Sequence, residues 1–303
     1  MNRGFDCMQA SRTRSLILTG FLVGAGWPAM AAGLAGGPPG SDDVPRSDVL
    51  PIAVGTVHES AHPKATVRIE QDCPDCPQLS RIEIPESVGT RARVLTVGRF
   101  EVTWKEYLKS VDDASCPIPS LLDGTKVDPR DPRLRDRVAV TGMGYKGAEC
   151  YVQWLSRRTG KVYRLPTVEE WEFAARGGAA SRYPWGDALG FNNALVGTAF
   201  DMLRYPMIDV YDQRMPSNIR VTGLLSPNRF GLHDVVGNAF ELTSTAVVLP
   251  VEECWPGETP PCHRLIIKSG PLEDDAPLSQ TFYMKATMAN ANTGFRVVRD
   301  EAK

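Results

Sequence analysis

One stretch of the sequence, residues 163–178, specifies a helix at both of its ends. It begins as a short extended run that stops at Pro166, and Thr167 then stands three residues before Glu170. This spacing is a capping box, in which both side chains bond to backbone amides at the start of a helix. A glycine pair beginning at Gly177 ends the helix, because glycine readily adopts the left-handed conformation found there. Taken alone, the stretch predicts a buried, well-capped helix.

Composition limits the chain to one large globular domain or two small ones. It has 303 residues, of which 42% are hydrophobic and 23% charged, as in ordinary globular proteins. It also holds 27 glycines and 24 prolines, so we expect much of the fold to be loop. The formal net charge is −2, and we expect no nucleic-acid partner because binding that ligand requires a basic surface.

The first 31 residues have the pattern of a secretory signal peptide. Arg12 and Arg14 supply a positive region, residues 15–26 an apolar region, and residues 29–31 a small-x-small cleavage site. The apolar run is too short for a membrane-spanning helix, so no transmembrane anchor is expected after cleavage. The sequence therefore predicts a periplasmic or secreted protein with residues 1–31 as its signal peptide.

A linker and one domain are predicted after this segment. Residues 32–64 are rich in Gly, Pro, Asp and Ser, which is typical of a flexible tether. The domain is predicted over residues 65–303. Its first part should contain strands near residues 65–70, 82–84 and 93–97, where apolar and polar residues follow an extended pattern.

Two more helices are predicted before a long irregular region. Thr103 and Glu106 form a second capping box. Another helix is expected over residues 147–158, where apolar residues share one face and Gly160 can end the helix. From residue 188 to residue 227 the periodicity fades, and Asn, Asp, Gly and Pro indicate long loops.

Export determines what the cysteines can do. The chain has seven, of which Cys7 leaves with the signal peptide. An even number in an oxidising compartment favours disulfides. Cys73 and Cys76 form a C-x-x-C motif that could hold zinc or act in redox chemistry in the cytosol. In an exported chain with no second matching pair, a small structural disulfide is favoured.

A series of short motifs resembles the formylglycine-generating, sulfatase-modifying factor family, and the motifs occur in the order that the family shows. They are Cys-x-x-Cys-Pro at 73–77, Glu-Val-Thr at 101–103, Tyr-x-x-Trp-Leu at 151–155, Thr-Gly-Lys-x-Tyr-Arg-Leu-Pro at 159–166, Pro-Trp-Gly-Asp at 184–187, Pro-Asn-x-Phe-Gly-Leu at 227–232, Gly-Asn at 237–238 and Gly-Phe-Arg at 294–296. The resemblance covers about residues 71–299. It implies an α+β fold that is irregular, rich in loops and related to C-type lectins.

The resemblance also implies a set of disulfides and a structural calcium ion. Together with nearness in the sequence, it implies the pairs Cys73–Cys76, Cys116–Cys150 and Cys254–Cys262. In the family, calcium is held partly by backbone carbonyls of an Asp/Asn-x-x-Gly-Asn segment, and Ca²⁺ prefers such hard oxygen ligands. This set carries over onto the side chain of Asp234 and the carbonyls of Val235, Gly237 and Ala239. The alternative for Asp234 is a turn-stabilising aspartate. A second family site maps onto Asn193 and Ala194, with Asp212 as a partner.

Catalysis is where the resemblance fails. Formylglycine-generating enzymes hold Cu(I) with two cysteines a few residues after an Arg-Gly-Gly-Ser segment, for which residues 268–271 stand here. The two cysteine positions fall on Asp274 and Ser279, and no cysteine follows Cys262. A carboxylate and a hydroxyl cannot replace the soft thiolates that suit Cu(I), so copper is not expected. The acidic run at 273–275 could be a metal or acid–base site, but a solvated loop is favoured because no histidine is near in sequence.

Three classes of function remain open. The missing thiols favour a noncatalytic exported member that binds an unidentified protein or peptide partner as an accessory module of the cell envelope. A second class is a cysteine-independent oxidase of a peptide or peptide-derived substrate, in which Glu241 or Asp274 would be the acidic residue to test. Formylglycine generation itself has the least support.

Overall fold

The computed structural model describes residues 65–86, 92–119, 137–188, 221–269, 277–290 and 292–301. All of them belong to one compact unit, Gly55–Lys303. The predicted signal peptide and linker over residues 1–64 lie outside the described residues, as does most of the predicted loop region over 188–227. In the described part of the chain, no helix has both the length and the apolar character required to cross a membrane.

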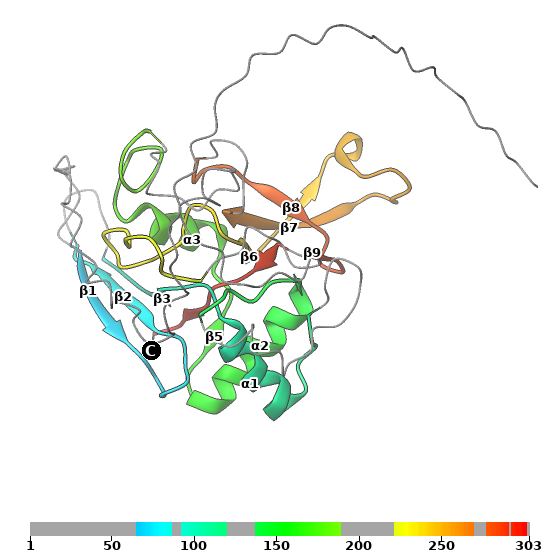
Figure 1. Cartoon of the computed structure of the whole chain (residues 1–303). Coiled ribbons are helices and arrows are strands. Elements are labelled where there is room, and N and C mark those ends of the chain that lie inside the picture. The colour runs from blue at the N-terminus through cyan, green and yellow to red at the C-terminus, as the bar shows by residue number, and fades with distance from the viewer. Residues whose placement is uncertain are drawn as a thin grey trace, which may run out of the picture. The chain divides into compact units, whose positions relative to one another are not determined.

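The larger sheet joins the two ends of the described domain. Its strands, in spatial order, are β1 (Thr66–Glu70), β2 (Leu79–Ile84), β3 (Arg93–Gly98), β11 (Val298–Arg299) and β5 (Tyr163–Arg164) (Figure 1). All neighbouring pairs are antiparallel. The last strand of the chain therefore lies inside the sheet, where it links the N-terminal strands to the segment that leads into α3.

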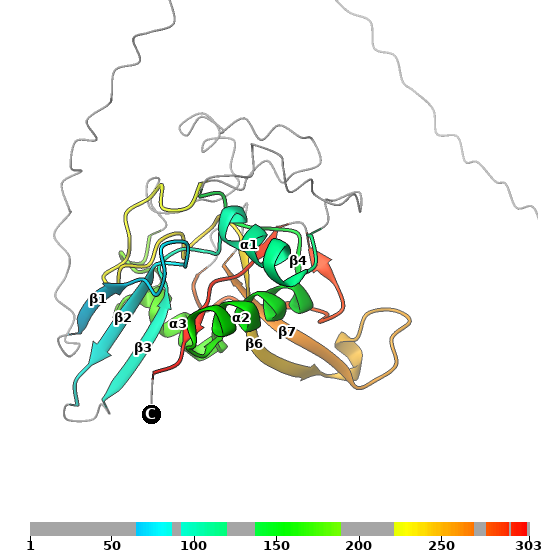
Figure 2. The same ribbon diagram turned by 90° about the horizontal axis from the view of Figure 1, so that it is seen from below.

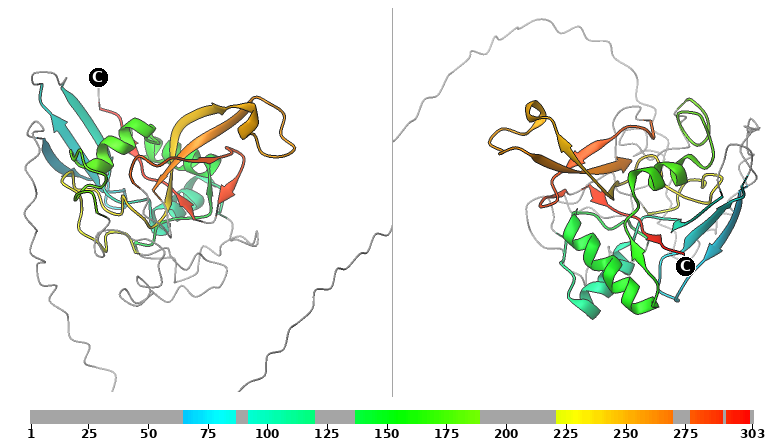
Figure 3. Two further views of the ribbon diagram at one scale, coloured as in Figure 1. Left: turned by 90° about the horizontal axis from the view of Figure 1, so that it is seen from above. Right: turned by 180° about the vertical axis from the view of Figure 1, so that it is seen from behind.

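A second sheet is built around a long hairpin. Its order is β10 (Thr293–Gly294), β6 (Phe240–Leu249), β7 (Cys262–Ser269) and β8 (Phe282–Met284), and a separate pair joins β4 (Met143–Gly144) to β9 (Ala289–Asn290). β10 and β6 are parallel, whereas the other pairs are antiparallel. The far half of the β6–β7 hairpin, with a short 3₁₀ helix at Val251–Glu253, projects away from the other elements (Figure 3).

The described residues form the α-helices α1 (Trp104–Ala114), α2 (Tyr145–Thr159) and α3 (Val168–Arg176). Both predicted capping boxes are confirmed, with Thr103 and Thr167 each accepting from the backbone amide three residues on. Gly160 and Gly177 end their helices in the left-handed conformation. α1 and α2 pack side by side (Figure 2).

The hydrophobic core has two clusters. The first lies against α1 and α2, where Phe295 packs edge-on against the rings of Tyr107 and Tyr151, at centroid distances of 6.4 and 5.5 Å. The second packs α3, through Trp171, against residues of β2, β3 and the segment around Phe230. Each cluster contains residues from distant parts of the sequence. The fold therefore brings together motifs that are far apart along the chain.

Comparison with the sequence predictions confirms the α+β class and shows one shifted strand start. The strand expected from residue 82 begins instead at Leu79, because Leu79 and Ser80 are buried and paired with Gly98 and Val97. The long strands β6 and β7 were not predicted from the sequence. Three disulfides are present, and they are the pairs expected from the resemblance: Cys73–Cys76, Cys116–Cys150 and Cys254–Cys262.

Candidate functional site

Residues of several sequence motifs meet in a buried polar cluster, which we call the signature centre. Its members are Glu101, Trp171, Asp234, Asn238, Glu241 and Arg296. At its heart, Arg296 Nε donates to Glu241 Oε2 at 2.5 Å and Nη2 donates to Oε1 at 2.6 Å. Neither side chain is exposed to solvent (0% each). This bidentate geometry is the strongest form of arginine–carboxylate contact.

The remaining donors of Arg296 are used by backbone. Nη1 donates to the carbonyls of Gly98 (3.1 Å) and Arg99 (3.3 Å), and Nη2 donates to the carbonyl of His233 (3.1 Å). Burial disfavours the charged guanidinium, but Glu241, with Glu101 and Asp234, raises the pKa of Arg296 above its ordinary value. Arg296 therefore stays charged and ties the end of β3 to the start of β6.

Trp171 connects α3 to the same pair. Its Nε1 donates to Glu241 Oε2 at 2.8 Å, so each oxygen of this carboxylate has a partner. The sequence analysis named Glu241 as a candidate for acid chemistry in an oxidase. In the structure its carboxylate is closed in by Arg296 and Trp171, and a substrate could reach it only by breaking those bonds. This arrangement is that of a structural residue.

Glu101 explains the Gly-Asn motif. Asn238 Nδ2 donates to Glu101 Oε2 at 2.7 Å, and the backbone amide of Ala239 donates to Oε1 at 3.1 Å. Gly237 and Asn238 both have positive φ (96° and 60°), a conformation that glycine and asparagine tolerate. Burial, with the nearby charges of Asp234 and Glu241, raises the pKa of Glu101 well above its ordinary value.

Asp234 is the least satisfied member of the centre. Its Oδ2 accepts from the backbone amide of Gly223 at 2.6 Å, whereas its buried Oδ1 has no hydrogen-bond partner among the described residues. Burial raises the pKa of Asp234 to about 6. The centre therefore holds three carboxyl groups, an excess over its one arginine.

This excess and the unpartnered oxygen fit a hard cation at the calcium position implied by the resemblance. Asp234 would supply a carboxylate oxygen, and the loop that follows carries the carbonyls of Val235, Gly237 and Ala239. The carbonyl of Gly237 already accepts from Ser269 Oγ at 3.0 Å, but a carbonyl oxygen has two lone pairs. The second set, Asn193 and Ala194 with Asp212, lies outside the described residues.

The place of the family's catalytic pair is at the end of β7. Lys268 is fully buried, with Nζ donating to Glu172 Oε1 (2.8 Å) and to the carbonyl of Gln280 (2.6 Å). Ser279 is exposed, and Asp274 lies outside the described residues together with the rest of the acidic run at 273–275.

The space beside these residues is small. A void of ≈ 10 Å³ lies between Ser269, Leu278 and Phe282, which is enough for about one water molecule. Burial lowers the pKa of Lys268, opposed by Glu172, and the ammonium lies 5.7 Å from the centroid of the Trp171 ring. Within the described residues, this region is therefore packed rather than open to a substrate.

One group of potential metal ligands occurs in the described part of the chain, near the tip of the β6–β7 hairpin. It comprises Cys254, Glu258 and Cys262, whose ligand atoms lie within 4.8 Å of one another. The two sulfurs form a disulfide, and Glu258 is ion-paired with Arg264 and Lys285. The group therefore stabilises the end of the hairpin and offers no free thiolate to a metal.

The sequence analysis missed most contacts of the signature centre. It gave Gly-Phe-Arg as a family motif and a capped helix within residues 163–178, but it did not predict that Arg296 and Trp171 share the carboxylate of Glu241 across separations of 55 and 70 residues. In the sequence, Arg296 is marked only by its position directly after Gly294 and Phe295. Asp234 and Glu241 were identified as candidates, and the structure places both in this centre.

Comparisons with known proteins show which family this chain resembles. A family profile described as "Sulfatase-modifying factor enzyme 1-like domain" matches residues 52–301. The formylglycine-generating enzyme of Mycobacterium tuberculosis is 35% identical over 118 residues, which cover 38% of this chain and 37% of that protein. The mouse protein called inactive C-alpha-formylglycine-generating enzyme 2 is 33% identical over 114 residues, covering 37% of this chain and 34% of that protein. These matches therefore span about a third of each relative's length.

A longer match and a solved structure extend the likeness. The bovine formylglycine-generating enzyme is 24% identical over 266 residues, covering 79% of this chain and 69% of that protein. The structure of PvdO from Pseudomonas aeruginosa superposes with a TM-score of 0.55 at 21% identity, covering 77% of this chain and 98% of that chain. This structural likeness shows the fold, which is the α+β, loop-rich fold of formylglycine-generating enzymes.

Proposed function

The chain belongs to the sulfatase-modifying factor family, and we propose that it acts there as a noncatalytic binding or accessory module. The observation that carries the proposal is where the cysteines lie and how they are bonded. No cysteine follows Cys262 in the sequence, and the six cysteines of the described residues are all paired in disulfides. The chemistry of the family depends on Cu(I) held by soft thiolates, which suit this ion and which Asp274 and Ser279 cannot supply.

The packing of the family's residues supports the same proposal. Glu241, the described acidic residue that a cysteine-independent oxidase would use, is enclosed by Arg296 and Trp171. Lys268 is likewise held by Glu172 and Gln280. In this proposal the sequence motifs preserve the scaffold, while the chemistry of the family has been lost. Similarity to a mouse relative described as inactive is consistent with this role.

The proposal places the protein outside the cytoplasm with calcium as a structural ion. Three disulfides are typical of an oxidising compartment, which supports a periplasmic or secreted location. Asp234, with the carbonyls of Val235, Gly237 and Ala239, would hold the ion. A bound Ca²⁺ supplies positive charge to a centre with excess carboxylate and has no part in redox chemistry.

Mass spectrometry of a co-expressed target peptide tests the proposal. A sulfatase-type peptide containing one cysteine would be produced with this protein in an exporting host, and in parallel with the M. tuberculosis relative as a positive control. We expect an intact cysteine with this protein and conversion to the aldehyde with the relative. Aldehyde formed by this protein, above the level in a host lacking it, would contradict the proposal.

A further inference from the structure

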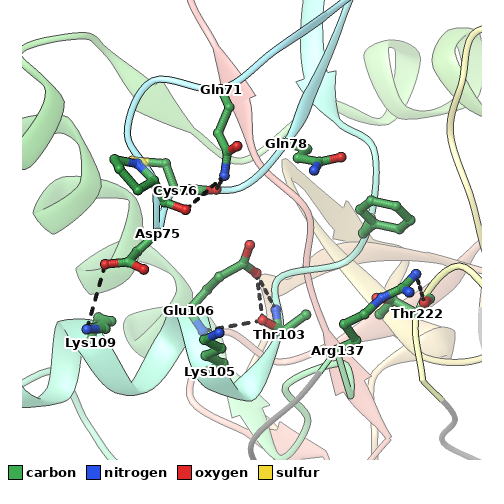
Figure 4. Close-up of a pocket in the computed structure, with 12 residues that line it drawn as sticks. Gln71, Asp75, Cys76, Gln78, Thr103, Lys105, Glu106, Lys109, Arg137 and Thr222 are labelled. Carbon is green, nitrogen blue, oxygen red and sulfur yellow. Dashed lines mark hydrogen bonds and ion pairs between the residues drawn. The ribbon is translucent and has the colours of Figure 1, made fainter.

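A cavity separate from the signature centre opens between the β1–β2 loop and the first turns of α1 (Figure 4). Its volume is ≈ 470 Å³, which is within the range of small-molecule sites. The loop contributes Gln71, Asp75 and Cys76, and α1 contributes Lys105 and Glu106. Arg137 closes the opposite side. No family motif accounts for these cationic side chains.

Arg137 is held in one orientation and forms no salt bridge with a described carboxylate, although its charge also acts on Asp234, where it opposes the rise in pKa that burial causes. Its Nη2 donates to the carbonyl of Thr222 at 2.8 Å, and its guanidinium lies 5.7 Å from the centroid of the Phe100 ring. Behind it, Gly223 has φ +75°, and a Cβ there would lie 2.6 Å from both Arg137 Nη2 and Phe100 Cε1. The backbone thus packs directly against this pair, so Arg137 presents a fixed positive charge to the cavity.

Lys105 provides a second positive charge, which also acts on the nearby carboxyl group of Glu106. It is the second residue of α1, it is exposed, and it forms no hydrogen bond or ion pair with a described residue. The two acids that line the cavity already have partners. Asp75 pairs with Lys109 at 3.8 Å and with Arg158 at 3.9 Å. Glu106 accepts from the backbone amide and hydroxyl of Thr103, both at 2.8 Å.

We propose that this cavity binds a ligand with one carboxylate attached to a hydrophobic group, with Arg137 and Lys105 contacting the carboxylate. The inference rests on the proposed binding role and names its ligand class. A monoanion suits the site better than a phosphate, because the carboxylates of Asp75 and Glu106 would repel a second negative charge. The apolar group would lie against Phe100, Pro74 and the Cys76 sulfur, which line the same cavity. The carboxylate can be that of a free acid or of a peptide C-terminus.

Isothermal titration calorimetry with defined probes tests this proposal on the full mature chain. The probes are 3-phenylpropionate, the tripeptide Gly-Gly-Phe with a free C-terminus, and the amide form of each. We expect the acids to bind and the amides to bind at least about tenfold more weakly, because each amide lacks the charge that Arg137 and Lys105 contact. The stronger of the two acids identifies the free-acid or the peptide source.

Two variants and one matched control assign the binding to the cavity. Lys105→Gln and Arg137→Gln should each weaken binding by about tenfold or more through loss of a charged contact. Lys146→Gln should leave it unchanged, because Lys146 is also an exposed second residue of a helix, α2, but does not line the cavity. Because Lys105 forms no hydrogen bond or ion pair with any described residue, Lys105→Gln should keep the melting temperature of the free protein.

Failure of this inference can be distinguished from failure of the proposed function. If neither acid binds, if acid and amide bind equally, or if Lys105→Gln binds as the unaltered chain does, the cavity assignment is wrong. A negative aldehyde assay would still leave the noncatalytic role in place. Aldehyde formation would overturn that role whatever the calorimetry shows.

Discussion

Two arginine–glutamate pairs in this protein have the same chemistry and different surroundings. Arg296 and Glu241 lie in the signature centre, with both side chains fully buried. Arg264 and Glu258 lie toward the tip of the β6–β7 hairpin, where Arg264 is buried against Trp255 but Glu258 keeps 16% of its side chain exposed. Each pair has a tryptophan beside it, Trp171 in the centre and Trp255 in the hairpin.

The pairs differ in how much of the chain they join. Arg296 bonds to groups up to 198 residues away, so it joins segments that are far apart in the sequence. Arg264 and Glu258 are six residues apart, and with Lys285 they brace one hairpin. We call the far half of the β6–β7 hairpin the arm. The comparison shows that the charged pair in the signature centre connects distant parts of the fold, whereas the charged pair in the arm stabilises only local structure.

The largest expected effect is that of Arg296→Lys. Lysine keeps the charge but cannot form a bidentate contact with Glu241 and also bond to three carbonyls. We expect a loss of about 3–5 kcal/mol in the free energy of unfolding, as when a buried pair is broken. Denaturant titration followed by circular dichroism measures it. Arg264→Lys is the matched control, and an equal loss in that variant would break the comparison.

Removing disulfides tests the same comparison, between a contact that joins distant residues and one that joins near residues. Replacing both Cys116 and Cys150 by serine should destabilise the fold by about 2–5 kcal/mol. This bridge spans 34 residues, whereas the Cys254–Cys262 bridge spans 8, and a longer loop confines the unfolded chain more. Replacing both Cys254 and Cys262 by serine should therefore lower the free energy of unfolding by less. Thermal melts of the two double variants measure this difference. A larger loss of stability on removing Cys254–Cys262 than on removing Cys116–Cys150 would contradict the account.

Calcium should act on the centre alone. If the ion binds at Asp234, calcium at about a hundred times its dissociation constant should add about 2.7 kcal/mol to the free energy of unfolding. Melting curves with calcium or with a chelator measure this gain, which Asp234→Asn should remove. A gain that persists in Asp234→Asn would place the ion elsewhere, and no gain in the unaltered protein would remove the calcium proposal.

The smallest effect is a pH response of the arm. Hydrogen bonding from Lys285, with Arg264 and despite some desolvation, lowers the pKa of Glu258 to about 2. Because this folded-state pKa is below the unfolded value, the stabilisation is present above about pH 4.5. It is lost as the pH falls toward 2. We expect Trp255 fluorescence to change in that window, and Glu258→Gln to abolish the change. An unaltered response in the variant would assign it to another group.

The sequence predicted what depends on neighbours along the chain and missed what depends on distant contacts. Thr167 and Glu170 are three residues apart, so their capping box could be found from spacing alone. Strand β6 carries Thr, Val and Leu in an extended pattern that is typical of a strand. The bond between Arg296 and Glu241 has no local sign, because it depends on the pairing of β10 with β6, which places Gly294, two residues before Arg296, beside Glu241.

Titration of the unreduced protein, produced without residues 1–31, with Cu(I) against a chromophoric competitor tests the central claim most directly. Because the six cysteines of the described residues are all in disulfides, we predict that this protein takes no Cu(I) from the competitor, while the M. tuberculosis relative does. Tight, stoichiometric Cu(I) binding by this protein, lost when Cys73 and Cys76 are replaced by serine, would contradict the account.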